Sequence, residues 1–462
     1  MAGTFRSMWA APGLAAVTLA LLAVSRREML FVAGPMILFW AAAPLIAWWL
    51  SRPSVKRPLR LSENQYHFLG MLTRRTWRYF EQCVTAEDHW LPPDNIQLNP
   101  DLVVATRTSP TNIGMAILAD LAARDFGYCS VGQLLIRTQR TFATLSGLER
   151  HHGHFFNWYD TRSLAPLHPR YVSMVDSGNL AGSLLVLASG FRELAAAGIL
   201  PSRLTGGLAD TLRVLLDEAR EGRGPRASGA FVRRVERQLE HLRHAPTTLR
   251  AASRLLADAT VAAVELVAET QDSLEVGWWA QAYLRCCEDH QAELRHLAPW
   301  IDVPAVAETF WTTGPEDSLA RRKRLWEMLH HLDGAATLRD VAEIRSTALP
   351  LLHGLLQDAP EACDWLLGLE VGLVQAAERA VARIERLEGV ALECREFANM
   401  DFGLLYDGER DLFAIGYNVS EQRRDAGYYD LLASEARLTS FILIAQGHFG
   451  QEHWFALGRL LT

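Results

Sequence analysis

The chain has 462 residues, of which 49% are hydrophobic and 21% are charged, as in a globular protein with a large core. This composition excludes a mostly disordered or collagen-like chain. Lys and Arg number 46 against 53 Asp and Glu, which gives a formal net charge of −7. Because no net positive charge is available to hold a polyanion, we expect no nucleic-acid partner.

Two uncharged stretches lie at the start of the chain. Residues 7–25 and 29–51 are each close to the roughly 20 residues that span a bilayer. We interpret them as a hairpin of two transmembrane helices. A cleaved signal peptide is the alternative, but it needs a strongly basic start and does not account for the second stretch, which ends near Trp48 and Trp49.

Basic residues flank the predicted hairpin on its outer side. They are Arg6, Arg52, Lys56, Arg57 and Arg60, whereas Arg26 and Arg27 lie between the two stretches. The positive-inside rule predicts that both ends of the hairpin, and the large soluble part that follows, face the cytoplasm.

Composition divides the rest of the chain into three parts. After a hairpin and basic linker in residues 1–60, residues 61–197 are rich in Trp, Tyr, Asn, Asp and Pro. Residues 198–396 are dominated by Leu, Ala, Arg and Glu, and residues 397–462 are again aromatic and acidic. We expect the chemistry in the two outer parts. The middle part, including Arg233, Arg234 and Arg321 to Arg324, is typical of solvated helix faces.

Helical periodicity predominates after the hairpin. Apolar residues recur every three or four positions at Leu204, Leu208, Leu212, Leu215 and Ala219, and again from Leu373 to Leu387. A β-hairpin is predicted where Phe402–Tyr406 and Leu412–Tyr417 flank a turn at Asp407-Gly408. The predicted class is all-α with one small β-hairpin.

Cysteine and histidine patterns give no sign of a metal site. The six cysteines form no C-x-x-C pair and are interpreted as reduced core thiols. His151, His152 and His154 are adjacent but have no acidic partner at helical spacing. No dinucleotide or phosphate-binding glycine motif is present, so we predict neither a metal nor a cofactor.

Three segments of the first outer part combine aromatic with hydrogen-bonding side chains. They are Trp90–Asn95, Thr106–Asn112 and Phe155–Asp160. Flat apolar sugar faces pack on Trp and Tyr, and sugar hydroxyls bind Asp, Asn and Arg, so such loops are typical of a glycan cleft. The alternative is that the rings pack between helices and the polar residues cap them. Asp176 and Ser177 stay ambiguous, since either can cap a helix beginning at Leu180.

Glu435 lies in an apolar helical stretch that continues to Ala445. Desolvation there would raise the pKa of its carboxyl towards the range of a general acid. The alternative is a pairing with Arg437 or another arginine.

The same segments resemble the central region of cyclic β-1,2-glucan synthases. The resemblance rests on ordered strings such as Ser109–Gly114, Val175–Gly182 and Tyr429–Arg437, and it covers most of the soluble part. It implies an (α/α)-barrel, incomplete here, with a helical insertion and the start of a glycoamylase-like domain. It also implies a multi-pass protein of the bacterial inner membrane.

The resemblance implies retaining transglycosylation that closes linear β-1,2-glucan into a ring. Glu435 matches the general acid/base position of the family, while the family's nucleophilic Glu lies beyond Thr462. The candidate substrate-binding residues are Trp90, Asp94, Asn95, Arg107, Asn112, Asn157, Trp158, Tyr159, Asp160, Arg170, Asp176, Asn179, Tyr429, Asp430, His453 and Trp454.

Two functions are compatible with this pattern. In the first, the chain supplies part of a cyclisation domain, and a partner chain carries the rest of the barrel and the glycosyltransferase. In the second, it is an inactive, membrane-tethered module that binds β-1,2-glucan. A fragment, a split gene and a decayed copy all stay open, and each predicts exposed apolar helix surface.

Overall fold

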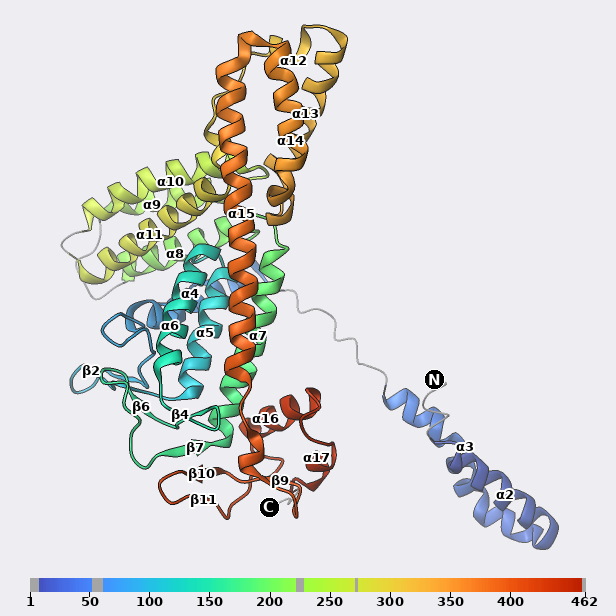
Figure 1. The fold of residues 1–462 in the computed structure, drawn as a ribbon. Helices are drawn as coiled ribbons and strands as arrows, with labels where there is room; N and C mark the ends of the chain where they lie inside the picture. The colour runs from blue at the N-terminus through green and yellow to red at the C-terminus, as the bar shows by residue number, and fades with distance from the viewer. Residues whose placement is uncertain (1–7, 52–60, 222–227, 271–272, 459–462) are drawn as a thin grey trace. The chain divides into compact units, whose positions relative to one another are not determined.

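The computed structural model describes residues 8–51, 61–221, 228–270 and 273–458. The chain forms two compact units, Met1–Asn64 and Gln65–Thr462. Helices dominate both, and the strands are short, which confirms the all-α class (Figure 1). The further division of residues 61–462 into three parts stays a prediction.

The first unit is a pair of apolar helices. α2 (Ala10–Ser25) and α3 (Leu30–Leu50) pack against each other across the short 3-10 turn η1 (Arg27–Met29). The segment Arg27–Leu50 is long and apolar enough to cross a membrane, with a mean hydropathy of 2.0 and 11% of its apolar window buried. α2 is apolar but shorter. The basic residues used to predict orientation, Arg6, Arg52, Lys56, Arg57 and Arg60, lie outside the described residues.

The second unit is built mainly from helices, with long connections at residues 84–109, 148–173 and 399–433. Its helices are α4 (Glu63–Cys83), α5 (Pro110–Asp125), α6 (Val131–Gly147), α7 (Met174–Ala195), α8 (Leu204–Glu221), α9 (Gly229–His241), α10 (Leu249–Glu269), α11 (Leu274–Leu297), α12 (Thr309–Thr312), α13 (Glu316–Ala335), α14 (Leu338–Asp358), α15 (Cys363–Ala398), α16 (Ser434–Ala445) and α17 (Glu452–Ala456). Three 3-10 turns accompany them, η2 (Pro299–Asp302), η3 (Pro360–Ala362) and η4 (Phe402–Leu405).

Short strands hold the loops at one end of this unit. They are β1 (Ile96–Gln97), β2 (Val103–Val104), β3 (Arg107–Thr108), β4 (Arg150–His151), β5 (His154–Phe155), β6 (Tyr159–Asp160), β7 (Tyr171–Ser173), β8 (Tyr406–Asp407), β9 (Leu412–Phe413), β10 (Gly416–Asn418) and β11 (Arg423–Arg424). β8 and β9 form the predicted hairpin, with Tyr406 opposite Phe413. Most of the first predicted strand is instead the turn η4, where the Asp401 carboxylate accepts from the Gly403 N–H.

The core runs through both predicted apolar stripes. Leu204, Leu208, Leu212, Leu215 and Ala219 are all buried on α8, as the spacing predicts. α15 buries Leu373, Ala377, Ala380 and Leu387 along the same helix face. With 36 residues, α15 is about 54 Å long. It packs on α14 near one end and on α7 further along, and so links the upper helices of Figure 1 to the loops below.

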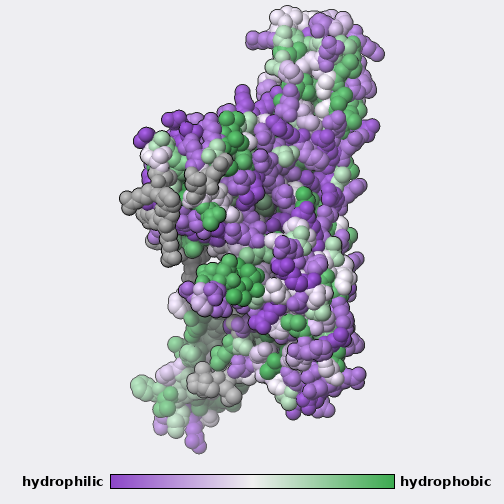
Figure 2. Space-filling model, turned by 90° about the vertical axis from the view of Figure 1, so that its left-hand side faces the viewer, coloured by the Kyte–Doolittle hydropathy of each residue, from purple (hydrophilic) through white to green (hydrophobic). Residues whose placement is uncertain are grey.

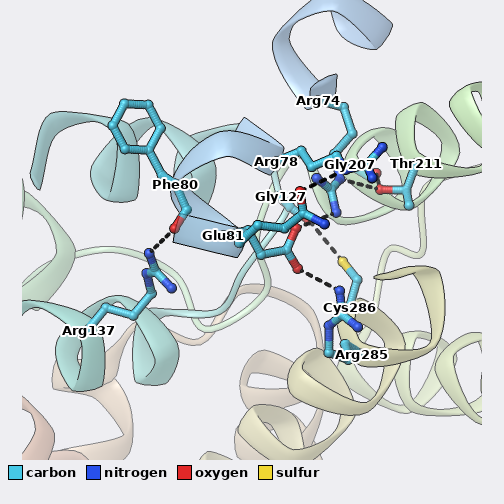
Figure 3. Close-up of polar contacts among 11 residues, drawn as sticks. Arg74, Arg78, Phe80, Glu81, Gly127, Arg137, Gly207, Thr211, Arg285 and Cys286 are labelled. Carbon is cyan, nitrogen blue, oxygen red and sulfur yellow. Dashed lines mark hydrogen bonds and ion pairs between the residues drawn. The ribbon is translucent and has the colours of Figure 1, made fainter. Parts of the chain in front are cut away.

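A charged junction attaches α4 to the rest of the unit (Figure 3). Arg74 is almost fully buried and donates to the Glu81 carboxylate at 2.9 Å and to the Thr211 hydroxyl at 2.9 Å. Arg285 of α11 reaches the other Glu81 oxygen at 3.1 Å, and Arg137 of α6 donates to the Phe80 carbonyl at 3.1 Å. One carboxylate thus joins two arginines from different helices.

The structure confirms one prediction about buried and exposed groups and corrects another. Cys129, Cys286, Cys287 and Cys394 are buried free thiols, and Cys83 and Cys363 are half-buried, as expected for core thiols.

The interpretation of Arg321 to Arg324 as a solvated face is wrong for Arg322, which is 2% exposed. Its guanidinium donates to the Phe310 carbonyl at 2.6 Å and to the Thr313 carbonyl at 2.9 Å, so hydrogen bonds offset the cost of burying its charge.

Candidate functional site

The loop before α5 is held in an unusual backbone conformation. His89 and Trp90 both have positive φ, 51° and 61°, which is costly for residues with side chains. Two α6 threonines fix the turn, since Thr144 donates to the His89 carbonyl at 2.6 Å and Thr141 to the Trp90 carbonyl at 3.1 Å. The turn buries Leu91 and directs the following residues towards the start of α5.

Asp94 is the first carboxylate of the candidate site. It accepts from the Arg107 guanidinium at 2.9 Å and from the Asn112 amide at 3.2 Å. The Asn95 amide donates to the same carboxylate at 3.0 Å. These four residues, all predicted from the sequence, therefore form one hydrogen-bonded group.

Asp176, in the first turn of α7, is the second carboxylate. The Thr111 hydroxyl donates to it at 2.5 Å, and the Asn157 amide donates at 2.6 Å in the orientation that also accepts from the Trp158 indole N–H. Asn179 donates to Thr111 at 3.1 Å. Thr111 and Asn112 are neighbours in the first turn of α5, so this one turn contacts both Asp94 and Asp176.

The helix start at Asp176 differs from the prediction. α7 begins at Met174 instead of Leu180, and the Ser173 hydroxyl caps it by accepting from the Asp176 N–H at 3.2 Å. Ser177 is buried and contacts His154. Because Ser173 provides the cap, the Asp176 carboxylate is available to the side-chain network.

Trp158 provides an aromatic surface beside the two carboxylates. The Arg107 guanidinium lies 4.7 Å from its ring centroid. Pairing of β3 with β6 places Arg107 opposite Asp160, so Trp158, two residues before Asp160, is the diagonal neighbour of Arg107. Both side chains keep access to solvent. An indole next to Asp, Asn and Arg groups is the arrangement that the glycan-cleft hypothesis requires.

The segment after α15 adds further acidic and phenolic groups. β10 pairs with β7, with Tyr417 opposite Val172, so residues more than 240 positions apart lie together. The Tyr171 hydroxyl donates to the Asp425 carboxylate. Burial raises the pKa of Tyr429, and the negative charges of Asp176, Glu435 and Asp425 raise it further. Three carboxylates are therefore close enough to Tyr429 to influence its ionisation.

The expectation that Glu435 is desolvated is wrong. Glu435 lies in the first turn of α16 with its side chain exposed, because the buried face of this helix is formed by Ala436, Thr439, Ser440 and Leu443 instead. Glu435 and Asp176 nevertheless both raise the pKa of Tyr429, so each lies within electrostatic range of that phenol.

Several predicted residues have structural contacts away from this group. Tyr159 is fully buried, and its hydroxyl donates to the Glu149 carbonyl at 2.6 Å, so it cannot touch a ligand at the surface. Asp160 accepts from the Ser163 N–H at 2.7 Å and closes a turn, which lowers the pKa of its carboxyl. Asp430 similarly accepts from the Leu432 N–H at 2.8 Å.

The remaining predicted residues also lie in other surroundings. The Trp90 ring is covered by the Arg140 guanidinium at 4.2 Å, and Arg170 is paired with Glu149 at 2.8 Å. His453 is buried, and its Nε2 lies 2.6 Å from the Ser440 hydroxyl. Trp454 is half-buried in α17, and its backbone N–H donates to the Gln451 carbonyl.

Sequence reasoning missed three members of the group, Thr111, Tyr171 and Asp425. Thr111 lies inside the segment Thr106–Asn112, and Tyr171 follows the predicted Arg170, but a hydroxyl carries no distinctive sequence signal. Asp425 follows a stretch of polar and charged residues, Glu421 to Arg424, which is typical of a solvated loop. Only the pairing of β10 with β7 brings it beside Tyr171.

His154, in the histidine-rich segment 151–154, has a structural role. His154 is fully buried, with Nδ1 2.9 Å from the Ser177 hydroxyl and Nε2 2.9 Å from the Asp401 carbonyl. Desolvation lowers the pKa of its imidazole to about 4. His154 thus joins α7 to the segment after α15 and supports the candidate site.

Comparison with known proteins gives one extensive match. The cyclic β-(1,2)-glucan synthase NdvB of Rhizobium meliloti (strain 1021) is 34% identical over 457 residues, which are 98% of this chain and 14% of that protein. This chain is similar over nearly its whole length to part of a cyclic β-(1,2)-glucan synthase. It spans only about one seventh of that relative's length. No family model matches.

Solved structures give weaker likenesses. Two proteins described as glucoamylases, from Bacteroides fragilis NCTC 9343 and Bacteroides caccae ATCC 43185, align with TM-scores of 0.25 and 0.24. Their identities are 19% and 22%, over 30% and 34% of this chain and 33% and 39% of theirs. At this level of similarity the two structures support no conclusion about the site.

Proposed function

We propose that this chain takes part in processing β-1,2-glucan and provides the sugar-binding side of a site for retaining transglycosylation. The observation that carries the proposal is the group around Asp94 and Asp176. Five loop and helix segments converge there, and they place carboxylates, amides, a guanidinium and an indole next to one another. Such groups match the alternating hydroxyls and apolar faces of a glucan chain.

In the proposed reaction, Glu435 is the general acid and base. It gives a proton to the glycosidic oxygen as a second carboxylate attacks the anomeric carbon and forms a glycosyl-enzyme. The Glu435 carboxylate then takes a proton from a hydroxyl of the same glucan, and that oxygen displaces the enzyme carboxylate. Glu435 is exposed in the free protein, so in this proposal bound glucan covers the carboxyl group during the reaction.

We also propose that α2 and α3 anchor the chain in the bacterial inner membrane, with Gln65–Thr462 on the cytoplasmic side. Support comes from the apolar segment Arg27–Leu50, whose 24 residues extend about 36 Å against a hydrocarbon core of about 30 Å. Fusion of reporter enzymes after residue 60 tests the orientation. Activity of a reporter that works only in the periplasm would contradict it.

The catalytic role is tested with the full chain in detergent micelles, mixed with a partner polypeptide that carries the rest of the barrel with its nucleophilic Glu, and incubated with purified linear β-1,2-glucan. We expect cyclic or transferred products by mass spectrometry. Glu435→Gln is expected to lower their rate of formation by about 10²–10⁴-fold. Glu421→Gln is the matched control, because Glu421 is also an exposed carboxylate of the segment after α15 and pairs with Arg423.

Each outcome separates one part of the proposal. An unchanged rate in Glu435→Gln contradicts the acid/base role. Bound glucan without products, in the mixture with the partner polypeptide, contradicts catalysis and supports the second candidate, an inactive glucan-binding module. The exposure of Glu435 is the observation that favours this second candidate. Absence of glucan binding contradicts both.

A further inference from the structure

A second group of aromatic side chains surrounds a pocket in the upper helical part of the molecule. The pocket has a volume of about 320 Å³ and lies between α10, the connection after η2, α13 and the start of α15. Four tryptophans from four different segments line it: Trp300, Trp311, Trp326 and Trp365. Pockets of this size hold small organic ligands. In Figure 2, hydrophobic residues reach the surface in this upper part, among hydrophilic ones.

The walls of this pocket are rigid. The Trp365 indole N–H donates to the Pro304 carbonyl at 2.8 Å, which fixes the ring. Trp311 and Trp365 meet edge to face, with ring centroids 5.8 Å apart. Phe310 packs against both, and the buried Arg322 guanidinium lies 4.3 Å from the Phe310 ring. A preformed aromatic surface loses little entropy when a ligand binds.

Polar groups line the same pocket. Asp333 accepts from the Arg250 backbone N–H at 2.9 Å, and the Arg250 guanidinium donates to the Ile301 carbonyl at 2.9 Å. His330 is exposed and packs on Trp326, with ring centroids 3.6 Å apart. Trp326 itself is 44% exposed, so a ligand can reach its ring from solvent.

We propose that this pocket is a second glucan-binding site, separate from the group around Asp94 and Asp176. The apolar face of a β-linked glucose ring can pack on an indole, while its hydroxyls reach Asp333, His330 and Arg250. The Arg250 guanidinium disfavours a cationic ligand, which an aromatic pocket otherwise attracts. The mixed polar lining also disfavours a purely apolar peptide.

The second site lies so far from the first that a single sugar could not occupy both, whereas a long glucan could. Trp365 is near the start of α15, and the other end of the helix leads into the segment that carries Asp425 and Glu435. Those two ends are roughly 50 Å apart at 1.5 Å per residue. Only a polymer can contact both regions, so the second site would retain a long glucan while another part of it occupies the first. This inference rests on the proposed function for its ligand class.

The test is a titration of the full chain with linear β-1,2-glucooligosaccharides. The tryptophans are replaced by 5-fluorotryptophan, and their resonances are followed by ¹⁹F NMR. The variants Trp311→Phe and Trp326→Phe identify the resonances of Trp311 and Trp326, because each variant lacks one of them. We expect both resonances to shift on titration, in the otherwise unmodified chain and in Asp176→Asn. Trp326→Ala is expected to weaken the affinity reported by Trp311 about tenfold. Leu367→Ala is the control, since Leu367 is similarly exposed nearby on α15 but does not line the pocket.

The outcomes distinguish the two proposals. If the Trp158 resonance, assigned with Trp158→Phe, shifts while those of Trp311 and Trp326 do not, the second site is wrong and the proposed function stands. If neither group shifts, both proposals fail. If the Trp311 resonance of Trp326→Ala still shifts and reports the same glucan affinity as in the unmodified chain, the assignment of the second site is also overturned.

Discussion

The loop-bearing end of the second unit and its upper helical part use charged residues in opposite ways. Around Asp94 and Asp176, half-buried carboxylates accept from side chains of distant segments and keep access to solvent. In the helical part, away from the pocket that Arg250 and Asp333 line, pairs such as Arg383 with Glu293 are sealed into the core, and pairs such as Arg234 with Glu265 are exposed on helix surfaces. Neither of these two kinds of pair combines a fixed geometry with access for a ligand.

This difference shows why charge content alone did not locate the site. Breaking a buried ion pair costs much stability, whereas an exposed pair contributes little to it. A half-buried network combines a fixed geometry of its polar groups with access for a ligand. The following predictions test whether the regions differ as described, from the largest expected effect to the smallest.

Removal of one partner of the buried pair should destabilise the helical part most. Arg383 is 7% exposed, and its guanidinium donates to Glu293 at 3.0 Å. Arg383→Ala leaves a buried carboxylate without its counter-charge, so we expect about 3–5 kcal/mol less free energy of unfolding by urea denaturation. Arg395→Ala, at an exposed position of the same helix, should change it by less than about 0.5 kcal/mol. Equal effects would contradict the distinction between sealed and exposed charges.

His154 should make stability depend on pH near the candidate site. Its folded pKa of about 4 lies below its ordinary value of 6.5. Between these values the unfolded chain binds a proton that the folded chain does not. The free energy of unfolding therefore falls as the pH decreases from about 6.5 to about 4, by up to about 3 kcal/mol.

Urea unfolding of His154→Gln across this pH range measures that contribution. The variant should show a flatter profile, although His290 and His453, whose pKa values are also lowered by burial, keep some slope. His448→Gln, at an exposed position, should keep the full slope. A slope that is the same in both variants would rule out a role for His154.

Substitutions in the half-buried network should affect ligand binding more than folding. Asp176→Asn weakens acceptance from Thr111 and Asn157, and Trp158→Ala removes the aromatic surface. We expect each to weaken binding of linear β-1,2-glucan about tenfold by calorimetry, with a change in unfolding free energy below about 1.5 kcal/mol. Asp430→Asn, which alters a turn outside the network, is the comparison. A stability loss with unaltered affinity would make the network structural.

Disruption of an exposed pair should have the smallest effect. Arg234 on α9 pairs with Glu265 at 2.6 Å and with Glu269 at 3.0 Å on α10, with all three side chains at least one third exposed. Arg234→Ala is expected to lower the free energy of unfolding by about 0.2–1 kcal/mol, and by less at high salt. A loss that is larger and independent of salt would show that this surface is packed more tightly than its exposure indicates.

Local patterns in the sequence were sufficient for the helices. Apolar residues repeating every three or four positions place one face of α8 and of α15 in the core, and this periodicity follows from helix geometry alone. The same holds for the apolar helices of the first unit and for the turn at Asp407-Gly408. Ring and amide residues clustered in loops also pointed to Asp94, Arg107, Asn112, Asn157, Trp158 and Asp176, which the fold brings together.

Long-range packing decided the rest. Tyr159 and His453 resemble ligand-binding residues in sequence, yet burial and hydrogen bonds to main-chain or core groups commit them to structure. Glu435 lies in an apolar stretch, but the helix turns its side chain outward, because neighbours along a sequence occupy different faces of a helix. Asp425 joins Tyr171 only through the pairing of β10 with β7. The sequence by itself determined which residues can form helices and bind sugars; the tertiary structure decided which of them meet, since that depends on contacts between segments hundreds of residues apart.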